Sequence, residues 1–403
     1  MEVSAMINAM RDPMGVPMYP VVFQLLMVLT FVLHILFVNL TVGAALLAVY
    51  GRLKSDGNWN RLSGAMGRAL PVNVSMAMLL GIAPLLFVQV IYDPFWYASN
   101  GLSAAWVIGF IAVMMAAYGF AYVQYLGGRD GKRPLIFGAL AAGLFVLAGV
   151  IMHAIGYQSL QPDRWLGWYA GSGAADTTGT ALHSLSLPRF LHFMVPSLAI
   201  TGVFMMLYAW YFRGRQDMDA DYLGWVGRTG ARMAFVFTAV QALVGLWWLA
   251  TLPGEFAFYA NPFFIAGAGL GLGLLVFLYL AQGDPVKFAV PSALVAFLAV
   301  AGMSTAREVL RMSYAGRFDY SIFDYRVNMD LGSAALFGGT FVMGLVILAY
   351  MLTVAFKAGR VSGQYEAAAS MHGWGRASVA LLLVWIALVA GLGLVLTVRN
   401  YIL

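Results

Sequence analysis

Residues 19–50 read YPVVFQLLMVLTFVLHILFVNLTVGAALLAVY and contain no Asp, Glu, Lys or Arg. A helix that crosses a bilayer needs about 20 apolar residues, so this run is long enough to span a membrane. His34 and Asn39 are polar groups within it. An ionisable side chain at such a depth indicates a functional site, because hydrocarbon is a costly environment for it.

The composition extends this conclusion to the whole chain. Of the 403 residues, 62% are hydrophobic and 10% are charged, whereas soluble domains usually contain about 25% charged residues. The sequence therefore predicts a polytopic membrane protein. The first eighteen residues lack a short apolar core followed by a small-residue cleavage site, so we expect no cleaved signal peptide.

The chain has no cysteine, which excludes several kinds of redox centre. Disulfides, thiolate-bound metals, iron–sulfur clusters and haem attached through Cys-x-x-Cys-His all require cysteine. A redox centre here would be held by His, Met, Tyr or carboxylate groups. The net charge of +6 does not indicate nucleic-acid binding, because the basic residues lie in short loops beside apolar runs, where membrane topology accounts for them.

Ten runs without charged residues predict an all-α transmembrane helical bundle of about ten helices, in a single integral-membrane domain over residues 1–403. Backbone that faces lipid must be helical to satisfy its own hydrogen bonds. The runs are 19–50, 70–92, 101–126, 134–158, 190–212, 233–253, 262–282, 288–306, 331–356 and 377–398.

The loop cations predict that both chain termini lie outside. In this orientation the cytoplasmic side receives most of the 23 Lys and Arg residues, as the positive-inside rule expects. The segments on that side are 51–69, 127–133, 213–232, 283–287 and 357–376.

Two outer segments are long enough to hold structure. Residues 159–189 are expected to begin with a short interfacial helix around Trp165 and Trp168. Residues 307–330 mix arginines, acids and aromatic residues, and we expect them to cap a site or dock a partner.

Three histidines are the ionisable groups of the apolar runs: His34, His153 and His192. Neutral imidazole is a good axial ligand for haem iron. The expected topology places His153 and His192 towards the outer face and His34 deeper. A lone intramembrane histidine equally serves as a hydrogen-bonding group between helices, but three in a chain otherwise free of such groups favour haem ligation. His183 and His372 lie in loops and are expected to be exposed.

Arg307 and Arg311 are four residues apart at the outer end of the eighth run and share a helix face. They are expected to hold haem propionates through charge-assisted hydrogen bonds. The alternative is that they only anchor the helix end by reaching towards the membrane surface. Likewise, the alternate glycines from Gly267 to Gly273 have two interpretations. They either allow a flat haem macrocycle to approach the helix closely, or they only allow neighbouring helices to pack closely.

Three segments resemble subunit I of the cytochrome bd quinol oxidases. His34-Ile-Leu-Phe-Val-Asn39-Leu-Thr-Val-Gly43 is similar to the family's first-helix motif, whose histidine ligates a haem of the oxygen-reducing pair. Leu187-Pro-Arg-Phe-Leu-His192-Phe resembles the fifth helix, whose histidine ligates the low-spin b haem, and 306–311 resembles the outer end of helix eight. The resemblance covers residues 19–356 as helices one to nine, and 377–398 is an additional C-terminal helix.

The departures from the family limit what the resemblance implies. Family members have proline at the place of Asn39 and glutamates in helices three and eight, where the charge-free runs have none. The seventh run lacks the family's methionine, and the family's quinol-binding loop is reduced to residues 251–261. His34 and His192 therefore carry over as haem ligands, whereas oxygen reduction and the family's quinol site do not. His153 has no counterpart and is available as a replacement ligand, which would give a bis-histidine, electron-transferring haem.

The sequence thus leads us to expect a b-haem-binding membrane subunit of a quinol-linked electron-transfer complex in the bacterial inner membrane. It would bind one or more haem b groups and relay electrons between the quinone pool and an outer-face partner, such as a periplasmic cytochrome or an iron–sulfur protein. Two alternatives stay open. One is a terminal oxidase of the cytochrome bd type with rearranged ligands, and the other is a haem-free transporter or membrane anchor subunit.

Overall fold

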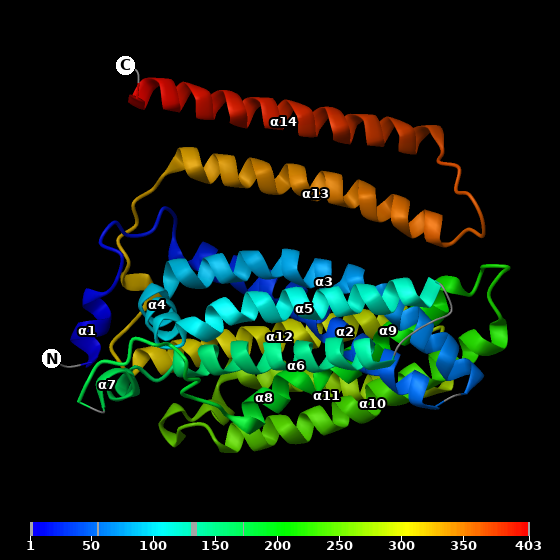
Figure 1. Cartoon of the computed structure of the whole chain (residues 1–403), viewed down its shortest axis with the longest axis horizontal. Helices are drawn as coiled ribbons and strands as arrows, with labels where there is room; N and C mark the ends of the chain where they lie inside the picture. The colour runs from blue at the N-terminus through cyan, green and yellow to red at the C-terminus, as the bar shows by residue number, and fades with distance from the viewer. Residues whose placement is uncertain (1–2, 55, 130–134, 172, 402–403) are drawn as a thin grey trace. The chain divides into compact units, whose positions relative to one another are not determined.

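The computed structural model describes residues 3–54, 56–129, 135–171 and 173–401, and this part of the chain is built from helices (Figure 1). None of the described residues belongs to a β-strand, and a single isolated bridge joins Val16 and Val327. Among the described residues, ten helical spans are long and apolar enough to cross a membrane. The predicted all-α bundle is confirmed, and the chain is a multi-pass membrane protein.

The spanning helices follow in chain order as α2 (Pro20–Lys54), α3 (Gly57–Ile91), α5 (Ala104–Arg129), α6 (Leu135–Gln158), α8 (Leu187–Met194) with α9 (Pro196–Phe212), α10 (Ala220–Ala250), α11 (Pro262–Leu280), α12 (Ala289–Gly316), α13 (Leu331–Gly359) and α14 (Ala369–Tyr401). The fifth span is divided into α8 and α9 at Pro196, because proline lacks the N–H that would continue the helical hydrogen bonds.

Shorter helices lie between the spans. They are α1 (Val3–Ala9), α4 (Asp93–Leu102) and α7 (Pro162–Ala170), with 3-10 turns η1 (Gly254–Phe256), η2 (Phe258–Ala260), η3 (Ala281–Gly283) and η4 (Ile322–Asp324). The short helix expected around Trp165 is present as α7.

The spanning helices extend beyond the charge-free runs that predicted them. The eighth run ends at residue 306, but α12 continues to Gly316. A helix of this length covers about 42 Å, which is more than the roughly 30 Å thickness of the bilayer hydrocarbon. Arg307, Glu308 and Arg311 therefore lie within a spanning helix. The expectation that the eighth helix contains no acid needs correction, because Glu308 is in α12 and is only 3% exposed.

Contacts divide the chain into two compact units, where the sequence suggests one integral-membrane domain. The first unit contains Met1–Trp210 and Ala220–Val327, and the second contains Tyr211–Asp219 and Asn328–Leu403. α13 therefore groups with α14, although the resemblance groups the ninth helix with the first eight. Two of the cations that support the expected orientation, at positions 132 and 133, lie outside the described residues.

Glycines bring several helices of the first unit into close contact. A Cβ added at Gly202 would lie 2.5 Å from the backbone nitrogen of Ala234, so α9 and α10 meet backbone to backbone. A Cβ at Gly267 would lie 3.0 Å from the carbonyl carbon of Gly302 in α12, whereas Gly271 faces open space. This contact supports the plain-packing interpretation for Gly267.

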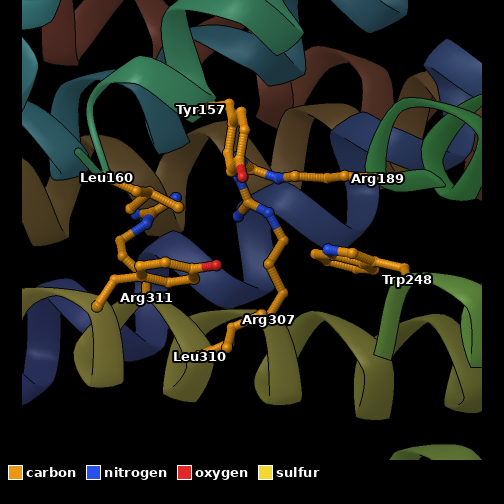
Figure 2. A pocket seen from close by; sticks show the side chains of 8 residues that line it. Tyr157, Leu160, Arg189, Trp248, Arg307, Leu310 and Arg311 are labelled. Carbon is orange, nitrogen blue, oxygen red and sulfur yellow. The ribbon is translucent and has the colours of Figure 1, made fainter. Parts of the chain in front are cut away.

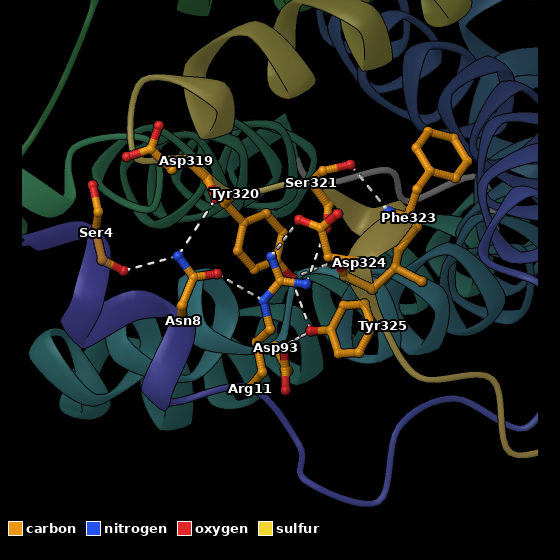
Figure 3. Close-up of polar contacts among 11 residues, drawn as sticks. Ser4, Asn8, Arg11, Asp93, Asp319, Tyr320, Ser321, Phe323, Asp324 and Tyr325 are labelled. Atoms are coloured by element: carbon orange, nitrogen blue, oxygen red, sulfur yellow. Dashed lines mark hydrogen bonds and ion pairs between the residues drawn. The ribbon is translucent and has the colours of Figure 1, made fainter.

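A polar cluster ties α1 to the segment that follows α12 (Figure 3). The Arg11 guanidinium lies 4.0 Å from the ring centre of Tyr320, whose hydroxyl is 2.8 Å from that of Tyr325. Tyr325 donates a hydrogen bond to Asp93 at the start of α4, and Asp93 also accepts one from the backbone N–H of Asp12 at 2.8 Å. These contacts define what we call the α1 end of the first unit, where α2 begins and α3 and α12 end.

Asp93 makes the stability of this cluster pH-dependent. Burial raises the pKa of its carboxyl above the ordinary value of 3.8, because the charged form loses hydration. The native state therefore holds this proton more tightly than the unfolded chain does. The contribution of Asp93 to stability is fully present below about pH 3.8 and is lost as the pH rises through the folded pKa. Relative to Asp93→Asn, which does not titrate, the wild type should lose thermal stability as pH rises.

The measurement is thermal unfolding of both proteins in detergent across a pH series. Asp319→Asn, in the neighbouring loop, is the control for removal of one acidic group. A difference between wild type and Asp93→Asn that stays constant with pH would contradict the expectation.

Candidate functional site

His34 is held by α3 in one defined tautomer. Its Nδ1 lies 2.8 Å from the backbone carbonyl oxygen of Ala77. A carbonyl only accepts hydrogen bonds, so Nδ1 carries the proton and Nε2 keeps a lone pair. Gly81, one turn further along α3, makes room for the ring, since a Cβ there would lie 2.8 Å from Cε1 of His34. Metal-binding histidines are commonly oriented by a second-shell acceptor of this kind.

His34 lines a cavity between α2, α3, α4, α6 and α12. Its volume is about 190 Å³, below the range of about 300–1,000 Å³ that is usual for small-molecule and cofactor sites. Its lining includes Phe31, His34, Gly81, Met152, Arg307 and Arg311. The site therefore combines one imidazole and two guanidiniums with mainly apolar walls.

The guanidiniums lie nearer the α1 end than the imidazole does. The Arg311 side chain lies 3.3 Å from the sulfur of Met27, and that of Arg307 lies 4.2 Å from the ring centre of Phe31. Met27 and Phe31 both precede His34 in α2, which starts at the α1 end.

A third arginine joins this pair in a small adjoining cavity of about 20 Å³. Arg189 of α8, Arg307 and Arg311 all line it, together with Tyr157 and Trp248. Figure 2 shows Arg189 and Arg307 reaching towards the same space from different helices. Arg307 and Arg311 line both cavities, so the two spaces share a wall.

Two of the three arginines have polar partners. Arg189 is 8% exposed and directs both terminal nitrogens at the backbone carbonyl of Gly156, at 3.4 Å. Arg311 forms an ion pair with Glu308 at 3.3 Å. Arg307 differs, since in the described part of the chain its buried Nε has no hydrogen-bond partner and its guanidinium contacts aromatic rings.

Glu308 is the acid that offsets this positive charge. One carboxylate oxygen accepts a hydrogen bond from the Tyr92 hydroxyl at 2.6 Å, and the other faces Arg311. Glu308 lines neither cavity. Three arginines and one glutamate leave two positive charges in largely apolar surroundings, and buried charge of this kind calls for a counter-charge. The arrangement suits a ligand with two carboxylate groups.

His192 is held in the opposite tautomer. The amide nitrogen of Gln241 in α10 lies 2.9 Å from its Nδ1 and 2.9 Å from its backbone oxygen. These two contacts use both amide hydrogens, so Nδ1 accepts and Nε2 carries the proton. His192 also packs against Trp248, with ring centres 5.0 Å apart, and it lines neither cavity. Ligation of a metal through Nε2 would require the Gln241 amide to turn.

His153 also has its Nε2 lone pair engaged. It accepts a hydrogen bond from the backbone N–H of Ser186 at 3.1 Å, and its ring stacks on Tyr157. His153 lines neither cavity. The structure thus brings His34, Arg307 and Arg311 together and places His153 and His192 outside their cavity.

The two histidines that the sequence predicted to lie in loops have different surroundings, and His372 in fact lies in α14. His183 is half-buried and stacks on Trp168 with ring centres 5.1 Å apart, whereas His372 is exposed. His183 therefore helps to hold its loop against α7.

Arg189 and Tyr92 are site residues that the sequence interpretation did not single out. Arg189 stands three residues before His192, outside the charge-free run, and so looks like an ordinary residue of a loop. An arginine directly before a spanning segment that contains a histidine is the signal that could have indicated it. Tyr92 ends an apolar run, where tyrosine is common, and gives no comparable signal.

No protein-family model and no curated protein matches the chain.

A glycine substitution tests whether His34 depends on close contact with α3. In Gly81→Ala the new Cβ would approach the His34 ring to 2.8 Å, so the ring must move and its bond to Ala77 must weaken. We expect a loss of about 1–3 kcal/mol in unfolding free energy, as for other overpacked sites. The measurement is thermal unfolding in detergent.

Gly109→Ala in α5 is the matched control, because a Cβ there meets no atom within 4 Å. This control should be neutral or slightly stabilised, since alanine favours helix by up to about 1 kcal/mol. Equal unfolding temperatures for the two variants would contradict the close contact.

Proposed function

We propose that the chain binds haem b in the His34 cavity and acts as a membrane subunit of a quinol-linked electron-transfer complex. The observation that supports this best is one cavity that holds an imidazole with a free Nε2 and two guanidiniums from a cluster with excess positive charge. Haem offers the matching groups, because its iron takes an imidazole nitrogen and its two propionates are carboxylates of the kind arginine binds well.

The residues have separate roles in this proposal. His34 is the axial ligand, and the Ala77 carbonyl orients it. Arg307 and Arg311, joined by Arg189, hold the propionates through charge-assisted hydrogen bonds. The apolar wall around Phe31 keeps water away from the site. The haem, when bound, supplies one-electron transfer.

The other two histidines have a smaller part in the proposal. His192 and His153 each accept a hydrogen bond at one ring nitrogen, Nδ1 of His192 from Gln241 and Nε2 of His153 from Ser186. Either would ligate a second haem only after its present partner is released. We therefore assign one haem, at His34.

The electron-transfer role rests on the resemblance to cytochrome bd subunit I. In this proposal the quinone pool exchanges electrons with the haem within the bilayer of the bacterial inner membrane. A periplasmic cytochrome or an iron–sulfur protein is the partner at the outer face. The α1 end is the side that the loop cations predict to be outside, and the guanidiniums lie towards that end of the cavity.

One observation favours the second candidate, a terminal oxidase of the cytochrome bd type. The eighth spanning helix does contain a buried acid, Glu308. One of its oxygens accepts a hydrogen bond from Tyr92 and the other forms an ion pair with Arg311, and Glu308 lines neither cavity. Electron transfer without oxygen reduction is therefore the proposal we retain.

The proposal is tested by the pyridine haemochrome and the reduced-minus-oxidised spectrum of the purified protein. We expect a b-type haem in the wild type and its loss in His34→Ala, because no other imidazole lines the cavity. His183→Ala, in a loop away from the cavity, is the control and should keep full haem content. A wild type without haem rejects the proposal, and a d-type signal would favour the oxidase.

Substitution of Arg307 is expected to change the stability of the haem-free protein and the retention of haem in opposite directions. Arg307→Met removes an unpaired guanidinium, so the haem-free protein should become more stable by about 1–4 kcal/mol. The same change should weaken haem retention by roughly tenfold to a hundredfold, since hydrogen bonds between charged groups contribute about 1.5–3 kcal/mol.

The two readouts are thermal unfolding of haem-free protein and haem transfer to an excess of apomyoglobin. Arg317→Met is the control, because Arg317 is 41% exposed and pairs with Glu255 at the surface. If Arg307→Met loses stability and keeps its haem, the arginine has a packing role alone.

A further inference from the structure

The small cavity beside the His34 cavity is surrounded by side chains that can donate hydrogen bonds. They come from α6, α8, α10 and α12 and carry three guanidiniums, two phenol hydroxyls and one indole N–H, and none of the described residues in the lining has a carboxylate. Donors that converge on one space with no acid among them indicate an anion-binding site. The donor residues are Arg189, Arg307, Arg311, Tyr157, Tyr314 and Trp248.

Several of these donors are not used by the protein itself. The buried Nε of Arg307 has no hydrogen-bond partner among the described residues. Within the same ranges, no hydrogen bond involves the hydroxyls of Tyr157 and Tyr314 or the indole N–H of Trp248. Arg189 reaches one backbone carbonyl, at 3.4 Å. A buried donor without an acceptor is costly, so a ligand that accepts these hydrogen bonds would stabilise the native state.

The unused donors point to one place. Figure 2 shows the hydroxyl of Tyr157 and the guanidiniums of Arg189 and Arg307 gathered in the middle of the cavity, with the nitrogen edge of Trp248 turned towards Arg307. Like charges repel more strongly in apolar surroundings than in water. Negative charge between the two guanidiniums would replace this repulsion by attraction.

The size of the cavity decides which anion it can hold. Its volume is about 20 Å³, and a cavity needs about 10–15 Å³ by the same measure to hold one water molecule. A chloride ion is only slightly larger than water, so a small adjustment of the side chains admits it. Phosphate and other polyatomic anions need several times this space. The cavity therefore suits a single halide ion.

We propose that the small cavity is a halide site, in which one chloride ion lies between Arg189 and Arg307. Arg311 and the hydroxyl of Tyr157 complete its surroundings. The ion accepts charge-assisted hydrogen bonds and cancels one of the two positive charges that Glu308 leaves uncompensated. Chloride binding does not require haem, so this inference goes beyond the proposed function.

The experiment uses the purified full-length protein in detergent and chloride as the probe. Gluconate, which is too large for the cavity, replaces chloride at constant ionic strength. A ligand that binds only the native state stabilises it increasingly as the ligand concentration rises above its Kd. We expect the unfolding temperature to rise with chloride concentration and the NMR line of chloride to broaden when the protein is present. A wild type that shows neither response overturns the proposal.

Variants connect the response to the cavity. Arg307→Met should weaken chloride binding by roughly tenfold or more, because it removes a charge-assisted hydrogen bond. Tyr157→Phe removes only a hydroxyl, which protects the test against a folding defect, and should also weaken binding. Arg317→Met is the control, since this exposed arginine pairs with Glu255 at the surface, and it should keep the full response. Wild-type affinity in both Arg307→Met and Tyr157→Phe overturns the halide site.

A carboxylate that reaches the arginines from the His34 cavity would supply the same negative charge. The two sources are separated by measuring the chloride response before and after transfer of bound haem to apomyoglobin. A response in both states supports a resident halide. A response that appears only after haem is removed assigns the charge to the haem carboxylates and overturns the halide site. A chloride response in a protein purified without haem supports the halide site and rejects the proposed function alone.

Discussion

The arginine cluster at the α1 end is the interaction on which the site depends. Arg189 joins α8 to α6 through the carbonyl of Gly156, and Arg307 joins α12 to α2 through the ring of Phe31. Arg311 contacts Met27 and lies over Tyr92 at 5.1 Å, which brings in the end of α3. Three guanidiniums thus hold together the helices that surround two cavities. Their charge exceeds that of the one acid beside them, so the same contacts that build the site also leave it with excess positive charge.

The three intramembrane histidines show how surroundings give different roles to the same side chain. An imidazole that donates from Nδ1 to a carbonyl has a basic Nε2, as His34 does. The amide of Gln241 imposes the reverse arrangement on His192, and a backbone N–H occupies Nε2 of His153. Second-shell partners of this kind decide which nitrogen is available to a metal. The distinction is made by groups on neighbouring helices and not by the histidine's own helix.

The fold was largely predictable from the sequence, and the site only in part. The charge-free runs indicated ten spanning helices because lipid requires both apolar side chains and internally satisfied backbone. They underestimated the helix lengths, since α12 continues through Arg307, Glu308 and Arg311 to Gly316. His34 was identified because ionisable groups are rare in spanning segments, and Arg307 and Arg311 because they are four residues apart and share a helix face.

The partners of the histidines could not have been predicted in the same way. Ala77 is 43 residues from His34, and Gln241 is 49 residues from His192. No sequence pattern near a histidine indicates that a carbonyl or an amide so far along the chain will contact it. Only the packing of the helices determines which ring nitrogen the carbonyl or amide contacts. Arg189 illustrates the same limit, because its role arises from four separate helices that converge on one space.

The position of the arginine cluster near one end of the bundle also has an electrical consequence. A charge that moves across a membrane potential of 100 mV gains or loses about 2.3 kcal/mol for a complete crossing, and proportionally less for a partial one. Under the proposed function, exchange of electrons between this cavity and the α1 end would cover only a small part of the membrane field, whereas exchange with the opposite end would cover most of it. The same redox step would thus be nearly independent of membrane voltage at one face and strongly dependent on it at the other.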